Sequence, residues 1–190
     1  MHPYLLTLLV HGSVAASLAL THPSTPCEKY VQRDSNLPNV TIFATGGTIA
    51  SSGSTTTQTT NYQVGVGIEE LVNAVPPLCN ISNVSGMQVT NVDSSSMNTS
   101  ILLDLSRRIT ASLDDPSTHG AVITHGTDTL EETAFFLDLT IASRKPVVVT
   151  GSMRPSTALS ADGPLNLYQA VKLAAANNTS NRGVMVVLNE

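Results

Sequence analysis

The sequence predicts an α/β fold in three layers, with a mostly parallel sheet that carries helices on both faces. Short runs rich in β-branched residues alternate along the chain with segments whose apolar residues have helical spacing. Several of these runs are continuously apolar, which is typical of parallel strands buried on both faces. The length of 190 residues suits one domain, and 41% hydrophobic residues favour a folded chain over a disordered one.

Five strands are expected, and each is a short apolar run bounded by glycine, proline or polar residues. The first is followed by Gly46 and Gly47, and it is too short to be a helix. The expected strands are Val40–Ala44, Val84–Val92, Ala121–Thr124, Pro146–Thr150 and Val184–Leu188.

Four helices are expected between these strands. The first is short and is stopped by Pro76 and Pro77. The second and third each place four apolar residues on one face, at Leu102, Leu105, Ile109 and Leu113, and at Leu130, Ala134, Leu137 and Ile141. The expected helices are Ile68–Val75, Ile101–Leu113, a segment from about residue 130 to 141, and Pro164–Ala176.

The first 20 residues are expected to be a secretory signal peptide, because two apolar stretches end near an A-x-A-like site at Ala16–Ala19. The alternative is a plain apolar helix. Residues 21–38 are polar with three prolines and read as an extended lead-in, so the domain is expected to span 39–190. Six N-x-S/T sequons agree with export and predict a glycoprotein, secreted to the exterior or cell wall, or periplasmic if bacterial.

Cys27 and Cys79 are an even count of cysteines in an expected oxidising compartment, which makes a disulfide between them plausible. The alternative is two unpaired thiols. Two cysteines cannot build a four-ligand zinc site, and 9 Lys plus Arg with a net charge of −5 argue against nucleic-acid binding. No apolar run reaches the roughly 18 residues of a membrane span.

Ligands of such sheets sit beyond the carboxyl ends of the strands. Four segments there are rich in hydroxyls, glycine or charge, and we expect them to converge on one crevice. They are Thr45–Thr48, Asp93–Ser96, His125–Asp128 and Gly151–Arg154.

Thr48 follows two glycines that allow a sharp turn and a close approach to a ligand. Its hydroxyl is a weak nucleophile that needs a neighbouring base, and the alternative is a turn that Thr48 merely caps. Tyr62 lies in a polar loop over residues 51–67, which is expected to be long and mobile. It could pack when the loop closes on a ligand, or it could simply be exposed.

Thr127 and Asp128 open the third helix, where Asp128 with Glu131, or Thr129 with Glu132, scores as a capping box. A helix N-terminus suits a substrate carboxylate, and Asp128 would hold an ammonium, which together describe an α-amino-acid site. His119 and His125 flank a strand and are expected to be structural. The serine run that begins at Ser94 is a turn by default.

These segments together resemble bacterial-type L-asparaginases. Phe43–Ala50 and Ile123–Ala134 are similar to the two signature segments of that family. The match continues in Pro146–Ser156 and Ser160–Tyr168, and the resemblance as a whole covers residues 37–190. It implies the family's N-terminal, nucleophile-bearing domain, with a flavodoxin-like or Rossmann-like sheet. With its expected export signal the chain is similar to the secreted type II branch of the family, and the sequons suggest a secreted form of the fungal type.

The resemblance implies hydrolysis of L-asparagine without metal or cofactor. It makes Thr48 the nucleophile that forms the acyl-enzyme, with Tyr62 assisting, and Thr127 and Asp128 a second catalytic pair. Ser94 would bind the substrate α-carboxylate, with Ser95 beside it where bacterial members often carry Gln. The substrate-binding residues are thus expected to be Thr48, Ser94, Ser95, Thr127 and Asp128.

Family members continue past the strand that matches Val184–Leu188 with a catalytic lysine and a smaller C-terminal domain, and they assemble as homotetramers. The sequence ends at Glu190, so we expect a truncated form that is catalytically incomplete by itself. The alternatives are a degenerate homologue that binds amino acids without catalysis, and a glutaminase-asparaginase.

Overall fold

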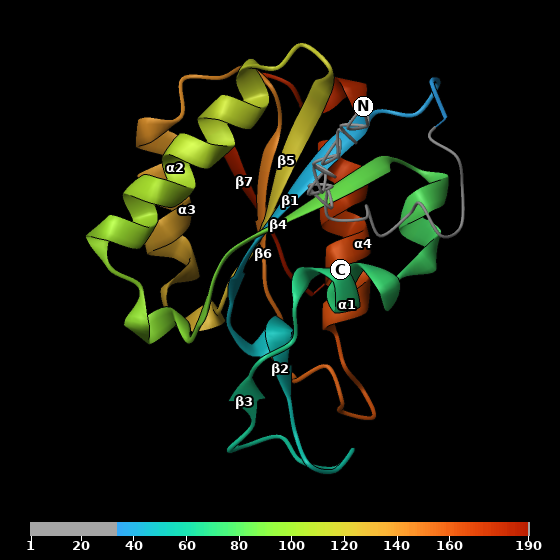
Figure 1. The fold of residues 1–190 in the computed structure, drawn as a ribbon, viewed down its shortest axis with the longest axis vertical. Coiled ribbons are helices and arrows are strands. Elements are labelled where there is room, and N and C mark those ends of the chain that lie inside the picture. Colours follow the sequence, from blue (N-terminus) through green and yellow to red (C-terminus); the bar gives the residue numbers. More distant parts are fainter. Residues whose placement is uncertain (1–33, 190) are drawn as a thin grey trace, which may run out of the picture.

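The computed structural model describes residues 34–189, which form a five-stranded parallel sheet between two layers of helices (Figure 1). The strands are hydrogen-bonded in the order β4-β1-β5-β6-β7, and every pair is parallel. The predicted α/β class is therefore confirmed. The predicted signal peptide at residues 1–20 and Cys27 lie outside the described residues, and the pairing of Cys27 with Cys79 stays a prediction.

All five predicted strands form. They are β1 (Asn39–Gly46), β4 (Asn83–Val92), β5 (Thr118–Thr124), β6 (Val147–Thr150) and β7 (Val184–Val187). The third begins at Thr118 rather than at Ala121, because its polar first residues pair with β1, where Thr118 lies opposite Asn39. Pairing with a neighbouring strand thus overrides a local sequence that lacks strand character.

The four predicted helices also form, as α1 (Ile68–Asn73), α2 (Thr99–Asp114), α3 (Leu130–Thr140) and α4 (Gly163–Ala174). The Asn98 side chain caps α2 by accepting a hydrogen bond of 3.1 Å from the Ile101 N–H. The first helix ends two residues earlier than expected, and a 3₁₀ turn, η3 (Pro76–Asn80), follows it.

The sheet separates two apolar cores, because successive side chains of a strand point to opposite faces. Val40, Ile42 and Ala44 of β1 face α1 and α4, whereas Phe43 faces α2 and α3. All four side chains are fully buried. Figure 1 shows the same division, with α2 and α3 on one side of the sheet and α1 and α4 on the other.

One crossover has the opposite hand to the rest. The β5-α3-β6 and β6-α4-β7 connections step in the same direction across the sheet, yet α3 and α4 pack on opposite faces. The α2 connection has the hand of the α3 connection, because both step in the same direction and pack on the same face. The α1 connection has this hand too, because it differs from them in both direction and face. Parallel crossovers have one hand in about 98% of cases, so the α4 connection is the exception.

Residues 51–67 are more ordered than the sequence predicts. Two short strands, β2 (Ser51–Ser52) and β3 (Gln63–Val64), pair antiparallel and form a ribbon that projects beyond the carboxyl ends of the sheet (Figure 1). Val66 is only 6% exposed and packs in the α1/α4 core. The expectation of one long polar loop is therefore wrong, because the segment contains a paired ribbon and Val64 and Val66 anchor it to the core.

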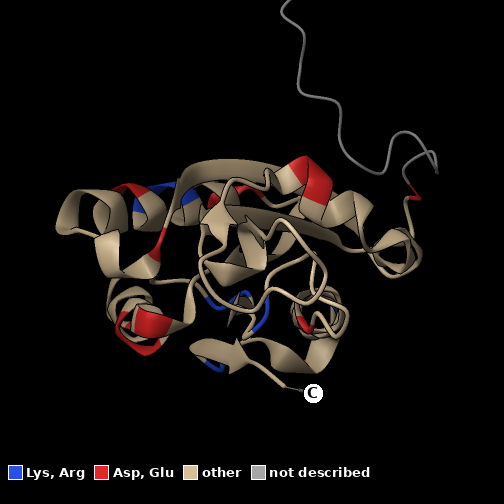
Figure 2. Cartoon of the chain, turned by 90° about the horizontal axis from the view of Figure 1, so that it is seen from below, with Lys and Arg blue, Asp and Glu red and all other residues tan. Residues whose placement is uncertain are grey.

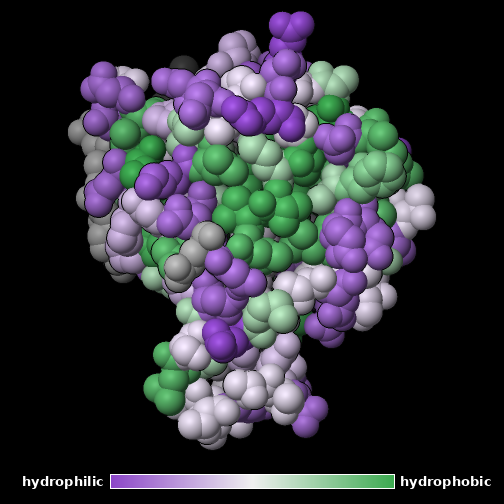
Figure 3. Space-filling view, turned by 180° about the vertical axis from the view of Figure 1, so that it is seen from behind, coloured by the Kyte–Doolittle hydropathy of each residue, from purple (hydrophilic) through white to green (hydrophobic). Residues whose placement is uncertain are grey.

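The surface is low in charge and carries one apolar region. Figure 2 looks onto the end from which the ribbon projects, and charged residues there are few and scattered. Figure 3 shows hydrophobic surface gathered on the back of the molecule, where β7 lies at an edge of the sheet with Val186 47% exposed. Within residues 34–189, no helix is long and apolar enough to cross a bilayer.

Candidate active site

The predicted site residues lie where the strand order reverses. From β1 the chain moves to β4 on one side, and it then returns to β5 on the other side. The carboxyl ends of β1 and β5 therefore mark the topological switch point, the usual ligand site of open α/β sheets. Thr48 follows β1, Ser94 follows β4, and Thr127 follows β5.

Three of the predicted segments meet at two glycines. Gly47 has φ of 78°, and a Cβ built on it would lie 2.2 Å from the Gly126 Cα. A Cβ on Gly126 would lie 2.6 Å from the Ser94 Oγ. The glycines thus bring together the backbone before Thr48, the backbone before Thr127, and the Ser94 side chain. The sequence predicted a close approach to a ligand, whereas the approach observed is between segments of the protein.

Thr48 begins a 3₁₀ turn, η2 (Thr48–Ala50), and its Oγ1 lies 3.1 Å from the Tyr62 Oη. Both side chains are half-buried. The turn is held by the Ser51 hydroxyl, which donates a hydrogen bond of 2.9 Å to the Gly47 carbonyl. Tyr62 follows Asn61, whose positive φ of 55° turns the chain into β3. The two residues predicted as nucleophile and assistant are therefore in contact.

Ser94 is 4% exposed and opens a 3₁₀ turn, η4 (Ser94–Ser96), in which Ser95 is exposed. The Thr129 hydroxyl donates a hydrogen bond of 2.9 Å to the Ser94 carbonyl, which ties this turn to the segment after β5. That bond replaces the predicted capping box, because α3 has no side-chain cap and begins after another 3₁₀ turn, η5 (Thr127–Thr129). The capping-box prediction is therefore wrong.

Thr127 and Asp128 differ from Thr48 and Tyr62 in having side chains with no polar partner in the described part of the chain. Thr127 is half-buried and Asp128 is exposed. Within residues 34–189, neither side chain has a hydrogen bond or ion pair, in contrast to Thr129 beside them. A hydroxyl and a carboxylate without internal partners at the opening of a helix can bind a polar ligand. Residues 34–189 contain no group of three or more His, Cys, Asp or Glu placed to bind a metal ion.

His125 is a structural residue, as the sequence predicts. It is fully buried, its Nδ1–H donates to the Gly126 carbonyl at 2.7 Å, and its Nε2 lies 2.9 Å from the Thr133 hydroxyl. Burial lowers the pKa of the imidazole below its ordinary value, and the Gly126 carbonyl and the Glu132 carboxylate offset that only in part. A neutral ring with the proton on Nδ1 satisfies both contacts, so His125 holds the peptide that precedes Thr127.

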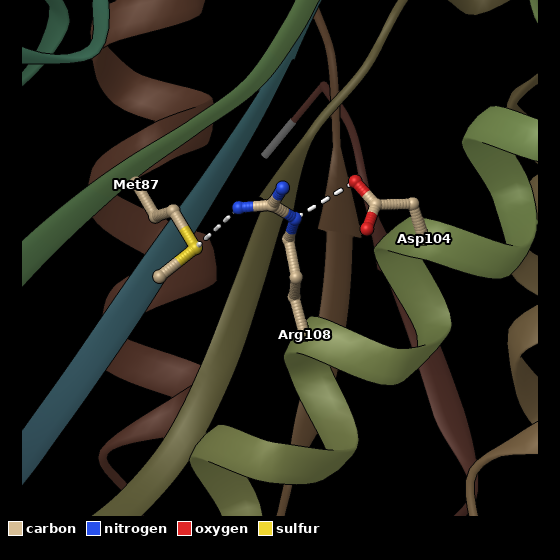
Figure 4. Close-up of polar contacts among 3 residues, drawn as sticks. All are labelled: Met87, Asp104 and Arg108. Atoms are coloured by element: carbon tan, nitrogen blue, oxygen red, sulfur yellow. Dashed lines mark hydrogen bonds and ion pairs between the residues drawn. The ribbon is translucent and has the colours of Figure 1, made fainter.

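A separate groove of about 530 Å³ lies between α2 and β4 and contains none of the predicted site residues. Its lining includes Arg108, whose Nε donates to Asp104 at 2.8 Å and whose Nη1 lies 3.7 Å from the Met87 sulfur (Figure 4). The groove extends toward the amino ends of β1 and β5, where Asn39 and Thr118 line it. The candidate active site therefore lies elsewhere, at the carboxyl ends of the strands.

The family model for the N-terminal asparaginase domain matches residues 39–190. The chain belongs to the asparaginase family. It is 50% identical over 181 residues to "Probable L-asparaginase 1" of Schizosaccharomyces pombe, covering 92% of this chain and 50% of that protein. It is 58% identical over 155 residues to "L-asparaginase 2" of Escherichia coli, covering 81% of this chain and 44% of that protein.

A solved structure of this family, a probable cytoplasmic L-asparaginase from Campylobacter jejuni, matches with a TM-score of 0.78 and 49% identity. The match covers 80% of this chain and 46% of that one. The chain spans about half the length of the asparaginases that it matches.

The prediction of a secreted, extracellular or cell-wall protein is contradicted by this comparison, because the matched structure is described as a probable cytoplasmic enzyme. The expectation of a glycoprotein rested on secretion and falls with it. Two of the sequon asparagines are also engaged within the fold. The Asn39 amide donates to the Ser117 carbonyl at 2.8 Å, and the Asn83 amide donates to the Leu37 carbonyl at 3.1 Å.

Sequence reasoning missed the contribution of Thr129, and it missed Asp162 and Asn166 at the start of α4. The Asp162 carboxylate accepts hydrogen bonds from the Met153 and Arg154 N–H groups at 2.8 and 2.9 Å. The available signal was the position of Asp162 immediately before Gly163 and Pro164, which is typical of a residue that opens a helix.

Proposed function

We propose that the chain is the nucleophile-bearing domain, residues 39–190, of an L-asparaginase that hydrolyses L-asparagine to L-aspartate and ammonia. The observation that carries the proposal is the 3.1 Å contact between the Thr48 and Tyr62 hydroxyls at the switch point of the sheet. A threonine hydroxyl becomes a useful nucleophile when a neighbouring group accepts its proton, and this geometry supplies that neighbour. Membership of the asparaginase family supports the same reaction.

In the proposed mechanism the Thr48 Oγ1 attacks the side-chain amide carbon of asparagine while its proton passes toward the Tyr62 oxygen. Tyr62 passes its own hydroxyl proton on to the amide nitrogen and so stays neutral, and the tetrahedral intermediate collapses when the carbon–nitrogen bond breaks and ammonia leaves. This leaves an ester between Thr48 and the aspartyl group. Water then attacks the ester carbon, the Thr48 oxygen regains its proton, and L-aspartate is released.

The α-carboxylate and α-ammonium of the substrate are proposed to bind at the segments after β4 and β5. The Ser94 hydroxyl and the first N–H groups of η5 suit a carboxylate, since helix openings favour anions. The Asp128 carboxylate, exposed and without a partner in residues 34–189, suits the ammonium. Thr127 and Ser95 complete the proposed set, with Thr127 acting as a second catalytic group.

One observation favours a binding function as the second candidate. The Thr127 hydroxyl has no polar partner in residues 34–189, so the described residues supply no base for it. A homologue that binds amino acids without hydrolysis would have this arrangement.

Glutamine is a further proposed substrate, because one methylene changes binding by only about 1–3 kcal/mol. The resemblance to the family also leads us to propose a homotetramer for the full-length protein.

Substitution of Thr48 tests the proposal. We expect Thr48→Ala in the full-length protein to abolish ammonia release from L-asparagine, while L-aspartate still binds. Tyr62→Phe removes only the hydroxyl and should lower kcat by about 10²–10⁴-fold, the usual range for loss of a proton-transfer partner. Ammonia release and calorimetric binding of L-aspartate measure the two effects.

The control is Thr179→Ala, since Thr179 at the end of η6 (Asn177–Thr179) is buried and its hydroxyl donates to the Leu173 and Ala176 carbonyls that precede η6. Normal hydrolysis by Thr48→Ala would overturn the assignment of the nucleophile. Binding of L-aspartate by a wild-type protein that releases no ammonia would favour the binding function instead.

A further inference from the structure

A polar pair, the half-buried Asp162 and the buried Asn166, stands at the start of α4, outside the set of residues proposed to touch substrate. Asn166 is 1% exposed, and its Nδ2 donates to the Gly151 carbonyl at 3.0 Å and to the Asp162 Oδ2 at 3.1 Å. Its Oδ1 accepts from the Asn189 N–H at 3.1 Å. Asn166 therefore joins the loop after β6 to the segment after β7, and every polar atom of its side chain is used.

Asp162 holds the same loop from the other side. Its two carboxylate oxygens accept from the Met153 and Arg154 N–H groups, which lie on consecutive residues. Together with the bond from Asn166 to Gly151, these contacts fix the Gly151–Arg154 loop at three points. The bond from Asn166 to Gly151 is buried, so displacement of the loop would leave buried polar groups unpaired, and the two bonds from Asp162 restrain the rest of the loop.

This loop and the first turn of α4 lie against the segments that carry both candidate threonines. A Cβ on Gly151 would lie 2.7 Å from the His125 carbonyl oxygen and 3.4 Å from the Thr127 Cγ2. A Cβ on Gly163 would lie 3.1 Å from the Cγ1 of Ile49, the neighbour of Thr48 in η2. The start of α4 thus lies close against Ile49, the neighbour of Thr48, and the Gly151 loop that it holds lies close to Thr127.

We propose that Asp162 and Asn166 are positioning residues that set the distance between Thr48 and Thr127. They touch no substrate, and they act through the Gly151–Arg154 loop and the Gly163–Ile49 contact. This inference rests on the proposed function for its catalytic consequence, whereas the positioning itself is a property of the fold.

The inference also accounts for the unusual hand of the β6-α4-β7 crossover. A connection of the common hand would place α4 on the face of α2 and α3. Ile49 belongs to the core on the opposite face, together with Leu167 and Ala170 of α4. Only the exceptional hand therefore allows the first turn of α4 to contact the segment of Thr48 while it holds the loop beside Thr127.

Asn166→Asp tests the proposal, because it keeps the shape of the side chain and removes the donor to Gly151 and Asp162. The new carboxyl would face the Asp162 carboxylate, and two such groups share one proton at raised pKa. The other charged residue of the contacted segments is Arg154, whose guanidinium donates to the Ser160 carbonyl at 3.2 Å. The segment after β7 contributes Asn189, which is neutral.

At pH 8 we expect kcat/KM of full-length Asn166→Asp for L-asparagine to fall by about 10- to 100-fold, the cost of small misplacement of reacting groups. The ratio of variant to wild-type activity should rise as pH falls from 8 to 5.5, because protonation restores the donor. The double variant Asn166→Asp with Asp162→Asn, which removes the charge repulsion, should recover part of the loss at pH 8. A purely structural role predicts no rise of the ratio on acidification.

A readout independent of activity is the pair of Thr48 and Thr127 methyl resonances in a threonine-methyl-labelled protein. Both should shift in Asn166→Asp and in the milder Asp162→Asn, but not in the control Asn178→Asp, which alters an exposed asparagine of η6. Unmoved methyl resonances in a folded variant, or kcat/KM within twofold of wild type, would overturn the positioning role. If the methyl resonances shift and wild-type protein releases no ammonia, the proposed function fails and the positioning role stands.

Discussion

Hydroxyl groups at the carboxyl end of the sheet fall into two classes. Most of them donate to a backbone carbonyl, as Thr45 does to Thr124 and Thr150 does to Val187, at 2.9 and 2.8 Å. Thr48 instead contacts another hydroxyl, and Thr127 contacts no polar group in residues 34–189. A hydroxyl committed to a carbonyl has no proton to exchange with a ligand, whereas these two remain available. The Thr124 hydroxyl at the end of β5 also lacks a hydrogen-bond partner among the described residues, but Thr124 is fully buried. The two half-buried threonines that the sequence signatures single out are therefore the accessible ones.

At the residue scale, His125 makes stability depend on pH. Burial lowers its pKa in the folded state, so the unfolded chain binds a proton at higher pH than the folded chain does. The stability that depends on His125 is therefore fully present above the pKa of histidine in the unfolded chain, about 6.5. It is lost as pH falls below that pKa, by up to about 1.4 kcal/mol per pH unit.

We expect the thermal midpoint of the full-length protein to fall between pH 7 and pH 5. The decline should be shallower in His125→Gln, which cannot titrate. Thermal unfolding at several pH values measures both slopes, and parallel slopes for the two proteins would rule out His125 as the source.

At the scale of elements, the strands and helices with strong local patterns were predictable, whereas the pieces that depend on partners were not. A short, continuously apolar run of β-branched residues such as Val147–Val149 predicts a buried strand. The β2–β3 ribbon has no such pattern, since Ser51 and Ser52 gain strand structure only by pairing with Val64 and Gln63. Local sequence cannot report a partner more than ten residues away.

The same limit applies to the candidate site. The residues predicted from signature segments do lie together, because each follows a strand of one parallel sheet. The supporting bonds escaped prediction because they join distant segments, as Thr129 does with Ser94 and Asn166 with Gly151. The local spacing from Asp128 to Glu132 predicted a capping box and gave no sign of the bond from Thr129 to Ser94. Only the tertiary position of η4 decides where the Thr129 hydroxyl donates.

The bond between the η4 and η5 turns gives an element-scale prediction. Thr129→Val removes the 2.9 Å bond to the Ser94 carbonyl, so that the turn carrying Ser94 loses its tie to the turn carrying Thr127. We expect KM for L-asparagine to rise with a smaller change in kcat, because Ser94 is proposed to bind the substrate carboxylate. The loss of stability should be about 0.5–1.5 kcal/mol, the net value of one hydrogen bond, because the Ser94 carbonyl still accepts from the Met97 N–H at 3.1 Å.

The matched control is Thr179→Val, which removes a threonine hydroxyl that donates to the Leu173 and Ala176 carbonyls, at 3.0 and 2.6 Å, in a segment that carries none of the proposed site residues. It should lower stability by a similar amount and leave KM unchanged. Steady-state kinetics with chemical unfolding of both variants separates the two effects. Equal KM values for the two variants would mean that the η4–η5 tie plays no part in binding.

At the scale of the whole molecule, a rigid sheet carries a projecting ribbon that contributes Tyr62 to the site. β1 and β5 lie inside the sheet, and their apolar side chains are fully buried. β2 and β3 are two residues long, and the residues between them are mostly exposed. The ribbon is attached to the loop after β6, where the Ser156 N–H and the Thr157 hydroxyl bond to Ser51 and Gly53 at 2.8 Å each.

This contrast predicts the pattern of amide hydrogen exchange in the full-length protein. Amides of Val40–Ala44 and Ala121–Thr124 should exchange at least about 100-fold more slowly than those of the ribbon, because opening of the ribbon exposes less buried surface than opening of the central strands.

L-Aspartate, the proposed product, should slow exchange across residues 51–64 and at Thr127, since Tyr62 orders on contact with a bound ligand. The central strands should be unaffected. Exchange measured by mass spectrometry with and without L-aspartate tests this, and slower exchange at Thr127 with an unchanged ribbon would show that the ribbon does not close on the ligand.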